Sequence, residues 1–474
     1  MDVHVSLIGR RDLAGEIYRQ LRAAIVSGRL RPGDPLPPTR ELARRLSVSR
    51  STVTVAYDRL HGEGFVSSQV GAGTFVSPEA PVGSVAVRST DGALRPVGHW
   101  ERVRTPTAFA AAAEYDFRTG VPDASRFPLD TWRRLTGRAL RPAEVGRAYY
   151  GDPAGHPPLR EAIARHIGVS RGVQVTADQI IVTNGTQQAL DIVAAVLAEP
   201  GADVAVEDPG YTPPHLLFRA RGLRVTGVPV DDEGIVVDEI PDAARLVYVT
   251  PSHQYPVGTT MSLARRAALL QWADRHGGAI VEDDYDSEFR FAGRPVEPLQ
   301  TLDRSGRVVY VGSFSKTMLP TLRLGFVAAP PSLVPALQAA KYLTDWHTSL
   351  PTQVALAWFL DEGHFARHLR RMRAVYRERH DRVVDAISRG FADDLRVEPS
   401  SCGLHVSATA LALGPDDVGR VVRRAAVAGV AVQPLSMFRV GDGARAGVVV
   451  GYGAIEVDDI DEGLRRLRRA VREG

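Results

Sequence analysis

The most reactive candidate in this sequence is a lysine beside a run of hydroxyl residues. The chain has 58 basic residues, but only two of them, Lys316 and Lys341, are lysines. Lys316 ends the stretch Ser313-Phe314-Ser315-Lys316, and Arg323 follows seven residues later. A partly desolvated lysine can lose its proton, whereas arginine keeps its own, and only a neutral amine attacks an aldehyde. Lys316 is therefore a candidate nucleophile.

The polar neighbours of Lys316 indicate what it could react with. Ser313, Ser315 and Arg323 could hold an anion such as a phosphate group. An amine that forms a Schiff base beside a phosphate site is what pyridoxal phosphate requires. The alternative is a surface lysine in a serine-rich loop, and the short motif alone does not decide between the two.

Composition places the chain among globular proteins of more than one domain. It has 474 residues, of which 44% are hydrophobic and 24% charged, so it can bury a large core. The single cysteine, Cys402, rules out an intramolecular disulfide framework and leaves no cysteine cluster for a metal. We find neither a signal-peptide pattern nor the ~20 consecutive apolar residues of a membrane helix. We expect a cytoplasmic protein without a metal site.

Positive charge is concentrated in the first 78 residues. They contain 11 arginines and 7 acidic residues, which leaves +4, compared with +3 for the whole chain. Such an excess is typical of a module that binds nucleic acid. A solvated helical face would give the same count.

The same 78 residues predict three helices followed by a β-hairpin. Apolar residues at four-residue spacing begin a helix at residue 13, and Gly28 ends it. Two further helices are expected over 40–46 and 50–62. A glycine-tipped hairpin follows at 65–76. Three helices and a hairpin in this order predict a winged helix-turn-helix.

Residues 37–64 match the pattern P-x-x-R-x-L-A-x-x-L-x-V-S-R-x-T-V-x-x-A-Y-x-x-L-x-x-E-G, and the segment resembles the GntR family. The resemblance implies contacts with operator DNA from Arg40, Ser49, Arg50, Ser51, Thr52, Thr54 and Gly71. A helix N-terminus suits phosphate oxygens, and short hydroxyls there can approach base edges in the major groove. Some of these hydroxyls could instead only cap the helix.

A linker and a second domain follow. Residues 79–112 are rich in Pro, Gly, Ser and Ala without helical or alternating periodicity, which is typical of a linker between domains 1–78 and 113–474. Beyond it, apolar runs alternate with helical patterns, which predicts an α/β domain with a mostly parallel sheet. Ligands bind such sheets at the carboxyl ends of the strands. The runs are 180–182, 204–206, 246–249, 279–281 and 308–311.

Residues suited to binding a planar phosphate ester follow the first two runs. Gly185 would expose the N–H groups of Thr186 and Gln187 to an anion at the start of a helix. Tyr211 could stack on a planar ring. An ordinary capped turn and a tyrosine that only packs are the alternatives.

Acidic residues follow the fourth run, in Glu282-Asp283-Asp284-Tyr285-Asp286. A carboxylate there could keep a pyridine nitrogen protonated, and the Tyr285 hydroxyl could reach the phenolic oxygen of the ring. Runs of acids are usually solvated loops. This run ends an apolar strand, and we therefore favour a functional role.

In this order the motifs resemble a fold-type-I aminotransferase over residues 113–474. With the N-terminal segment, nearly the whole chain resembles the MocR (GabR-like) regulators. The resemblance implies a mostly parallel sheet with a smaller C-terminal α/β domain, and a head-to-tail homodimer. The segments that carry it are Pro251-Ser252-His253-Gln254, Glu282-Asp283-Asp284-Tyr285-Asp286-Ser287-Glu288-Phe289 and Phe314-Ser315-Lys316.

The resemblance also implies roles for single residues. Lys316 would bond covalently to pyridoxal phosphate, Asp283 would pair with its ring nitrogen, and Tyr285 would bond its phenolic oxygen. Tyr211 would stack on the ring. The phosphate would be held by Gly185, Thr186, Gln187, Ser313, Ser315 and Arg323, with Tyr150 of the partner subunit.

Two positions depart from the pattern of aminotransferases. Tyr255 stands where an Asn usually bonds the ring oxygen, and Met437 stands where an Arg grips a carboxylate. Arg439 is close in sequence, but it would face differently if this segment were a strand. Without a bidentate partner the site would hold amino acids weakly. We therefore expect an effector other than a simple amino acid held in the usual way, such as an amine or the vitamer itself.

Three functions fit the sequence. The first is a regulator that binds operator DNA and senses an amine, amino acid or vitamer effector through pyridoxal phosphate at Lys316. The second is a catalytically active aminotransferase with a DNA-binding appendage. The third is a DNA-binding protein whose second domain serves only for dimerisation. We expect the first, with that domain used for sensing rather than turnover.

Overall fold

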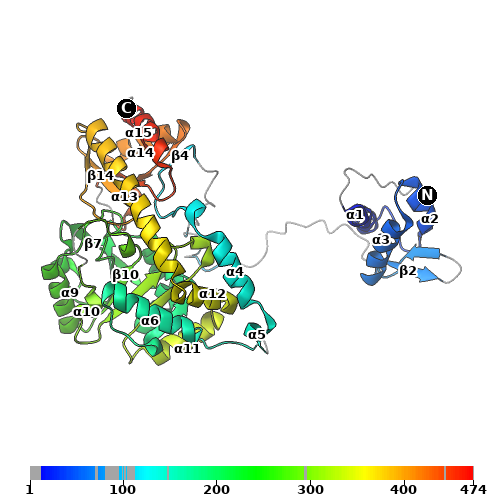
Figure 1. Ribbon diagram of the computed structural model, residues 1–474, viewed down its shortest axis with the longest axis horizontal. Helices are drawn as coiled ribbons and strands as arrows, with labels where there is room; N and C mark the ends of the chain where they lie inside the picture. Colours follow the sequence, from blue (N-terminus) through cyan, green and yellow to red (C-terminus); the bar gives the residue numbers. More distant parts are fainter. Residues whose placement is uncertain are drawn as a thin grey trace. The chain divides into compact units, whose positions relative to one another are not determined.

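The computed structural model divides the chain into two compact units, residues 1–97 and 98–474 (Figure 1). The limits predicted for the linker stay a prediction, because most of 79–112 lies outside the described residues. No helix among the described residues is long and apolar enough to cross a membrane. The structure describes residues 12–69, 73–80, 95–98, 100, 103, 113–146, 149–292, 296–441 and 445–472.

The described part of the N-terminal unit contains three helices and a three-stranded antiparallel sheet in the order β1-β3-β2. The helices and the β2–β3 hairpin are as predicted. Strand β1 was not predicted, because two residues after a proline turn carry no periodic pattern. The bounds are α1 (Leu13–Val26), β1 (Pro35–Leu36), α2 (Thr39–Arg45), α3 (Arg50–Gly62), β2 (Val66–Gln69) and β3 (Gly73–Val76).

The N-terminal unit has its own hydrophobic core. Ile17, Leu21 and Ile25 on α1 are fully buried, and they belong to one cluster with Val53 and Leu60 of α3. Residues four apart lie on the same face of a helix, so the repeat seen in the sequence is the face that packs. The winged helix-turn-helix is thus a folded unit with its own core.

The larger unit is built on an eight-stranded sheet in the order β5-β12-β11-β10-β9-β6-β7-β8. The pairs from β11 through β10, β9 and β6 to β7 are parallel, whereas β12 runs antiparallel to β11 and β5. All five predicted runs are strands of this sheet. The strands are β5 (Ile180–Thr183), β6 (Asp203–Asp208), β7 (Arg224–Asp231), β8 (Gly234–Ile235), β9 (Ala244–Val249), β10 (Ala279–Asp284), β11 (Val308–Ser313) and β12 (Gly325–Ala328).

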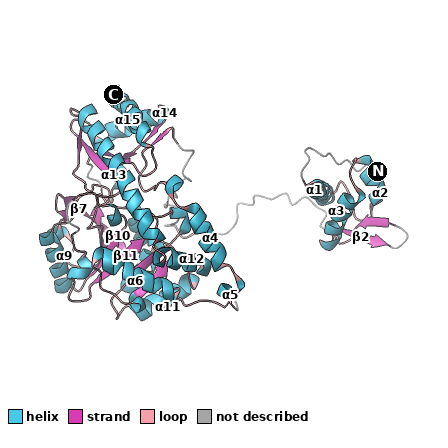
Figure 2. Cartoon of the chain, viewed as in Figure 1, coloured by secondary structure: helices cyan, strands magenta, loops and turns pink. Residues whose placement is uncertain are grey.

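Helices surround this sheet (Figure 2). On β9, Leu246 and Tyr248 belong to one buried cluster, whereas Val247 and Val249 belong to another. Alternate side chains of a strand point to opposite faces, so both faces are buried and the strands are continuously apolar. The helices are α4 (Leu129–Ala139), α5 (Pro142–Val145), α6 (Pro157–Arg171), α7 (Thr186–Leu197), α8 (Thr212–Ala220), α9 (Leu263–His276), α10 (Leu299–Leu302), α11 (Val334–Asp345) and α12 (Leu350–Asp361).

A smaller α/β part follows, as the resemblance implied. Its four-stranded antiparallel sheet has the order β13-β14-β17-β16. The long helix α13 extends from this smaller part to the part that contains the large sheet (Figure 1). A separate parallel pair, β4 with β15, joins the start of the described unit to this part. The elements are β4 (Tyr115–Asp116), α13 (His364–Gly390), β13 (Leu395–Val397), β14 (His405–Ala410), α14 (Pro415–Val427), β15 (Val430–Ala431), β16 (Gln433–Pro434), β17 (Gly447–Gly451) and α15 (Val457–Arg472).

The separate cores predict separate responses to a core substitution. Leu21→Ala should lower the free energy of unfolding of the N-terminal unit by about 3 kcal/mol, because it leaves a cavity in that core. Scanning calorimetry should show one transition moving to lower temperature and the other unchanged. Val55→Ala, at a position 50% exposed on α3, is the matched control. Two transitions that move together would contradict independent folding.

Candidate functional site

Lys316 follows strand β11 and is held by the backbone. Its Nζ donates a hydrogen bond to the carbonyl of Gly120 at 2.8 Å. Gly120 has a φ of 79°, and a Cβ there would lie 2.9 Å from Nζ, so glycine permits this approach. Burial lowers the pKa of the Lys316 ammonium, which favours the neutral amine that the sequence argument requires.

Asp283 is the last but one residue of the neighbouring strand β10 and is buried. Its Oδ2 accepts a hydrogen bond from the Tyr248 hydroxyl at 2.7 Å, whereas its Oδ1 has no partner among the described residues. Burial raises the pKa of Asp283 to about 7. A buried carboxylate oxygen without a partner is rare in proteins, and it fits an N–H donor such as a protonated pyridine.

The predicted phosphate residues lie on two turns that β12 brings together. Gly325 of β12 is the register partner of Thr183 on one side and of Ser313 on the other. The turn after Thr183 therefore lies beside the turn of Ser313 and Ser315, where the Ser315 N–H donates to Ser313 Oγ at 3.1 Å. The structure thus places both predicted phosphate-binding segments at the same edge of the sheet.

The first of these turns is open to an anion. Helix α7 begins at Thr186 after Gly185, and no side chain caps it, so the N–H groups of its first turn, including that of Gln187, lack helical acceptors. Arg323 Nη2 donates to the Asn184 carbonyl at 2.9 Å, and a Cβ on Gly185 would lie 2.8 Å from this Nη2 atom. Only glycine allows the guanidinium so close. Arg323 itself has a φ of 52°, a conformation that side chains other than glycine rarely adopt.

Three tyrosines group beside these residues. The Tyr255 ring lies edge-on to Tyr211, with centroids 5.5 Å apart, and edge-on to Tyr285 at 5.9 Å. Burial raises the pKa of Tyr211 to about 12, so the phenol stays neutral. The Tyr285 hydroxyl donates to the His253 carbonyl at 2.9 Å. Tyr285 is therefore near the site, with a partner of its own that the sequence did not predict.

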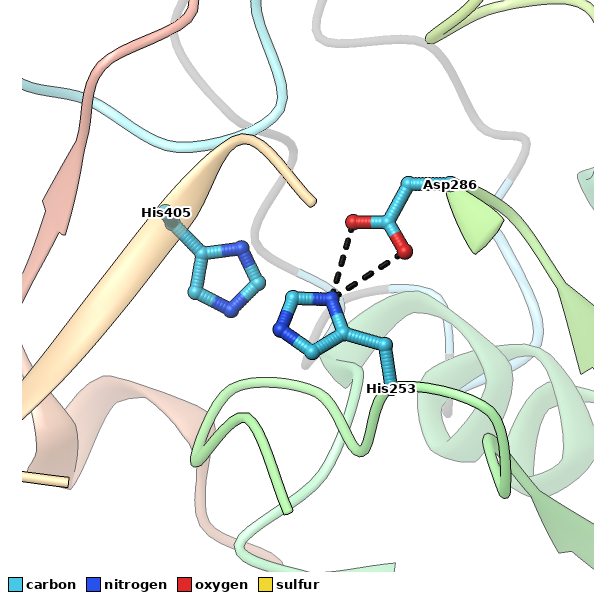
Figure 3. Close-up of side chains that lie close together, drawn as sticks. All are labelled: His253, Asp286 and His405. Carbon is cyan, nitrogen blue, oxygen red and sulfur yellow. Dashed lines mark hydrogen bonds and ion pairs between the residues drawn. The ribbon is translucent and has the colours of Figure 1, made fainter. Parts of the chain in front are cut away.

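Figure 3 shows a buried His–Asp pair, His253 and Asp286, with His405 close to it. His253 Nδ1 is 2.9 Å from Asp286 Oδ2, and His253 Nε2 is 3.1 Å from Ser400 Oγ. His405, on β14, donates from Nε2 to the Pro256 carbonyl at 3.0 Å, and burial places its pKa well below the ordinary value. Both nitrogens of His253 thus have protein partners. The group links the large sheet to the smaller α/β part.

The polar groups that form hydrogen bonds near Met437 are neutral. Thr119 Oγ1 lies 2.6 Å from the Tyr255 hydroxyl and 2.8 Å from Gln433 Oε1. Met437 lies in a 3-10 helix, Leu435–Phe438, so the strand geometry considered for Arg439 does not apply. A four-residue 3-10 turn gives no strand or helix period that a sequence argument could detect. Arg439 follows the turn, and its Nη2 is 3.6 Å from Asp208 Oδ2, so its charge is already compensated.

Tyr150 lies on the surface of the larger unit. It is 74% exposed, and its ring stacks on Trp346 with centroids 4.3 Å apart. Tyr149 is also exposed, at 77%, and Tyr342 at 45%. An exposed group of aromatic side chains is a common mark of an interaction surface.

The predicted DNA-binding residues surround the start of α3. Ser49 caps this helix by accepting from the Thr52 N–H at 3.1 Å, and its Oγ is 2.7 Å from those of both Ser51 and Thr52. The Thr54 hydroxyl donates to the Arg50 carbonyl. Ser49 thus caps the helix, and its side chain, like those of Arg40 and Arg50, is exposed, so the predicted DNA contacts stay predictions. Gly71 lies outside the described residues.

Comparisons with known proteins agree with both units. Residues 13–76 match the family described as bacterial regulatory proteins, gntR family, and residues 116–445 match aminotransferase class I and II. The chain is 39% identical over 459 residues to the probable rhizopine catabolism regulatory protein MocR of Rhizobium meliloti, which covers 96% of this chain and 93% of that protein. It is 33% identical to the pyridoxine biosynthesis transcriptional regulator PdxR of Corynebacterium glutamicum, over 97% of this chain and 96% of that one.

Solved structures resemble the larger unit. The alpha-aminoadipate aminotransferase LysN of Thermus thermophilus superposes with a TM-score of 0.72 at 30% identity, covering 80% of this chain and 97% of that one. A kynurenine aminotransferase of Pyrococcus horikoshii superposes with a TM-score of 0.71 at 27% identity, covering 80% of this chain and 95% of that one. Proteins of this fold family generally bind pyridoxal phosphate.

A GntR-type winged helix joined to an aminotransferase fold defines a class of transcription regulators that carry an aminotransferase-like domain. The length and identity of the matches make the assignment more specific. The chain belongs to the MocR-like subfamily of GntR regulators.

A second buried carboxyl, which the sequence argument did not select, predicts a pH effect. Glu207 is the last but one residue of β6, its Oε1 has no partner among the described residues, and burial raises its pKa to about 7. The folded state therefore binds this proton more tightly than the unfolded state does, and stability falls as pH rises from the unfolded to the folded pKa. Above about pH 7 the ionised carboxylate would cost at most about 3 kcal/mol.

Glu207→Gln should remove this cost. We expect the variant to exceed the unaltered protein in free energy of unfolding at about pH 8 and to match it at about pH 4, below the pKa of the unfolded carboxyl, since Gln carries no proton to lose. Urea denaturation at both pH values measures this. Glu233→Gln, on a side chain 57% exposed, is the control. The same pH dependence in Glu207→Gln would contradict the assignment.

Proposed function

We propose that this regulator binds pyridoxal phosphate at Lys316 and uses it to sense a small amine-type effector. The observation that supports this most is the placement of two groups: an amine of lowered pKa just after β11, and, on the neighbouring strand β10, a buried carboxylate oxygen that has no partner among the described residues. The open turn at Gly185 lies beside them. An amine, an acceptor for a ring N–H and an anion site are the three groups that this cofactor needs.

Each residue has a distinct task in this proposal. Lys316 would hold the cofactor covalently, Asp283 would accept the ring N–H, and Tyr211 would cover the ring. Phosphate oxygens would accept from the N–H groups at 185–187, from Ser313 and Ser315, and from Arg323. When bound, pyridoxal phosphate supplies an aldehyde that can exchange one amine for another. Tyr285 would turn its hydroxyl from the His253 carbonyl to the phenolic oxygen.

The effector would be an amine or a vitamer rather than an amino acid gripped by an arginine. Thr119, Gln433 and Met437 are uncharged and are linked by hydrogen bonds through Gln433, and Asp208 pairs with Arg439. A carboxylate brought there would lose water, and Arg439 is already paired with Asp208. The name of the Corynebacterium relative, a regulator of pyridoxine biosynthesis, agrees with a vitamer.

The signal would pass by a shift of populations. An effector that binds one state of the protein better than another favours that state, and operator affinity changes by the same linkage. We also propose that the protein acts in the cytoplasm as a head-to-tail homodimer. The exposed aromatic group of Tyr149, Tyr150, Tyr342 and Trp346 supports such a contact.

An active aminotransferase is the second candidate. The fold neighbours are aminotransferases, and Lys316 with Asp283 is also what such an enzyme needs. Sustained conversion of an amino acid with a keto acid would favour the enzyme. An unaltered protein without bound cofactor would favour a domain that only dimerises.

Lys316→Ala tests the regulator directly. The variant should lose the visible absorbance of the bound cofactor and all response of operator binding to effector. Operator affinity itself should be retained, because Lys316 and α3 belong to different compact units. Absorbance scans with a panel of amines, amino acids and vitamers, followed by DNA-binding titrations, measure this. Lys316→Arg keeps the charge but cannot bond the aldehyde, so it should behave alike. A variant that still responds to effector would exclude the mechanism.

Arg50→Ala tests the DNA contact. Loss of a phosphate contact should weaken operator binding and reduce the slope of log affinity against log salt by about 1. Arg19→Ala on α1 removes the same charge from an ion pair with Glu16 and is the matched control. If both variants change the salt slope equally, Arg50 makes no specific contact.

A further inference from the structure

The second lysine of the chain has no part in the function proposed above, although it is fully buried on α11. Lys341 Nζ donates to three acceptors: Asp345 Oδ1 at 2.5 Å, Gln188 Oε1 at 2.9 Å and Thr348 Oγ1 at 3.3 Å. An ammonium has three donors, and all three are used. Burying a charge is costly unless it is paired and hydrogen-bonded, and here it is both.

Two of these acceptors also hold the turn before α7. Asp345 Oδ2 accepts from Asn184 Nδ2 at 2.5 Å, and Gln188 Oε1 accepts from the Asn184 N–H at 2.8 Å. The ammonium of Lys341 thus fixes the side chain of Asn184 through Asp345, and the backbone N–H of Asn184 through Gln188. On the other side of the turn, Arg323 Nη2 binds the Asn184 carbonyl. Both polar groups of the Asn184 backbone, its N–H and its carbonyl, are therefore hydrogen-bonded.

We infer that Lys341 and Asp345 are a positioning pair that holds the turn at Gly185 in the conformation that receives a phosphate group. The inference rests on the proposed function. Neither side chain needs to touch the cofactor, because both act through Asn184 and Gln188. A turn that is already ordered loses less conformational entropy when the phosphate binds, so its affinity is higher.

The geometry also explains why this position is a lysine in a chain that otherwise uses arginine. The three acceptors surround one nitrogen, which suits the compact ammonium with its three rotatable donors. A planar guanidinium presents its donors in one plane and needs more room. Side chains on α11 and α7 would have to move to admit it.

The test compares pyridoxal phosphate with pyridoxal, which lacks the phosphate. The apo forms of the full-length protein and of Lys341→Met are titrated with each compound, and binding is followed by absorbance. Loss of hydrogen bonds to a charged group should weaken binding of pyridoxal phosphate about tenfold or more. Binding of pyridoxal should be unchanged, because it makes no use of the turn.

Two further variants make the test specific. Asp345→Asn keeps Lys341 and the shape of the site, and it should weaken pyridoxal phosphate selectively even if Lys341→Met fails to fold. Arg265→Met is the matched control, since its guanidinium is 15% exposed and binds Asp231 and the carbonyls of Gly234 and Ile235. It should bind both compounds as the unaltered protein does.

The outcomes separate this inference from the proposed function. Equal pyridoxal phosphate affinity in Lys341→Met and the unaltered protein would overturn the positioning role alone. So would an equal loss for both compounds, which would make the pair a general support of α11. An unaltered protein that binds neither compound would overturn the proposed function and this inference with it.

Discussion

The candidate site depends on the parallel register of β10 and β11. Asp283 pairs with Val311 in this register, so the carboxylate and the segment that carries Lys316 leave the sheet at the same edge. Both faces of the sheet are covered, which keeps water from Asp283 and raises its pKa to about 7. The same shielding lowers the pKa of the Lys316 amine. The pairing of β10 with β11 therefore places a carboxyl of raised pKa and an amine of lowered pKa in the same shielded region.

Much of this arrangement could be predicted because parallel strands are apolar along their whole length. The runs that end near Gly185, Asp283 and Ser313 are easily recognised, and their polar residues must then meet at one edge. His405 was missed because it lies on an antiparallel strand of the smaller part, where no motif marks it. The 3-10 turn at Met437 was not predicted, because four residues carry no helical or alternating period.

Contacts between side chains from distant parts of the chain could not be predicted from the sequence. Lys341 was noticed as one of two lysines, but its acceptors come from α7 and from the end of α11, and only the fold brings them together. The unpaired Oε1 of Glu207 among the described residues has the same origin, since burial of a carboxyl depends on neighbours far along the chain. Residue type indicated where chemistry was possible, and tertiary packing decided which groups are compensated and which are left free.

The scarcity of lysine has a consequence for the DNA-binding unit. Residues 1–78 contain 11 arginines and no lysine, and Arg40 and Arg50 are exposed at the start of their helices. Guanidinium groups stay protonated throughout the physiological range, so this surface keeps its charge in alkaline conditions. Acetylation neutralises lysine side chains. The winged helix presents no side-chain amine to that modification, and its attraction for phosphate is permanent.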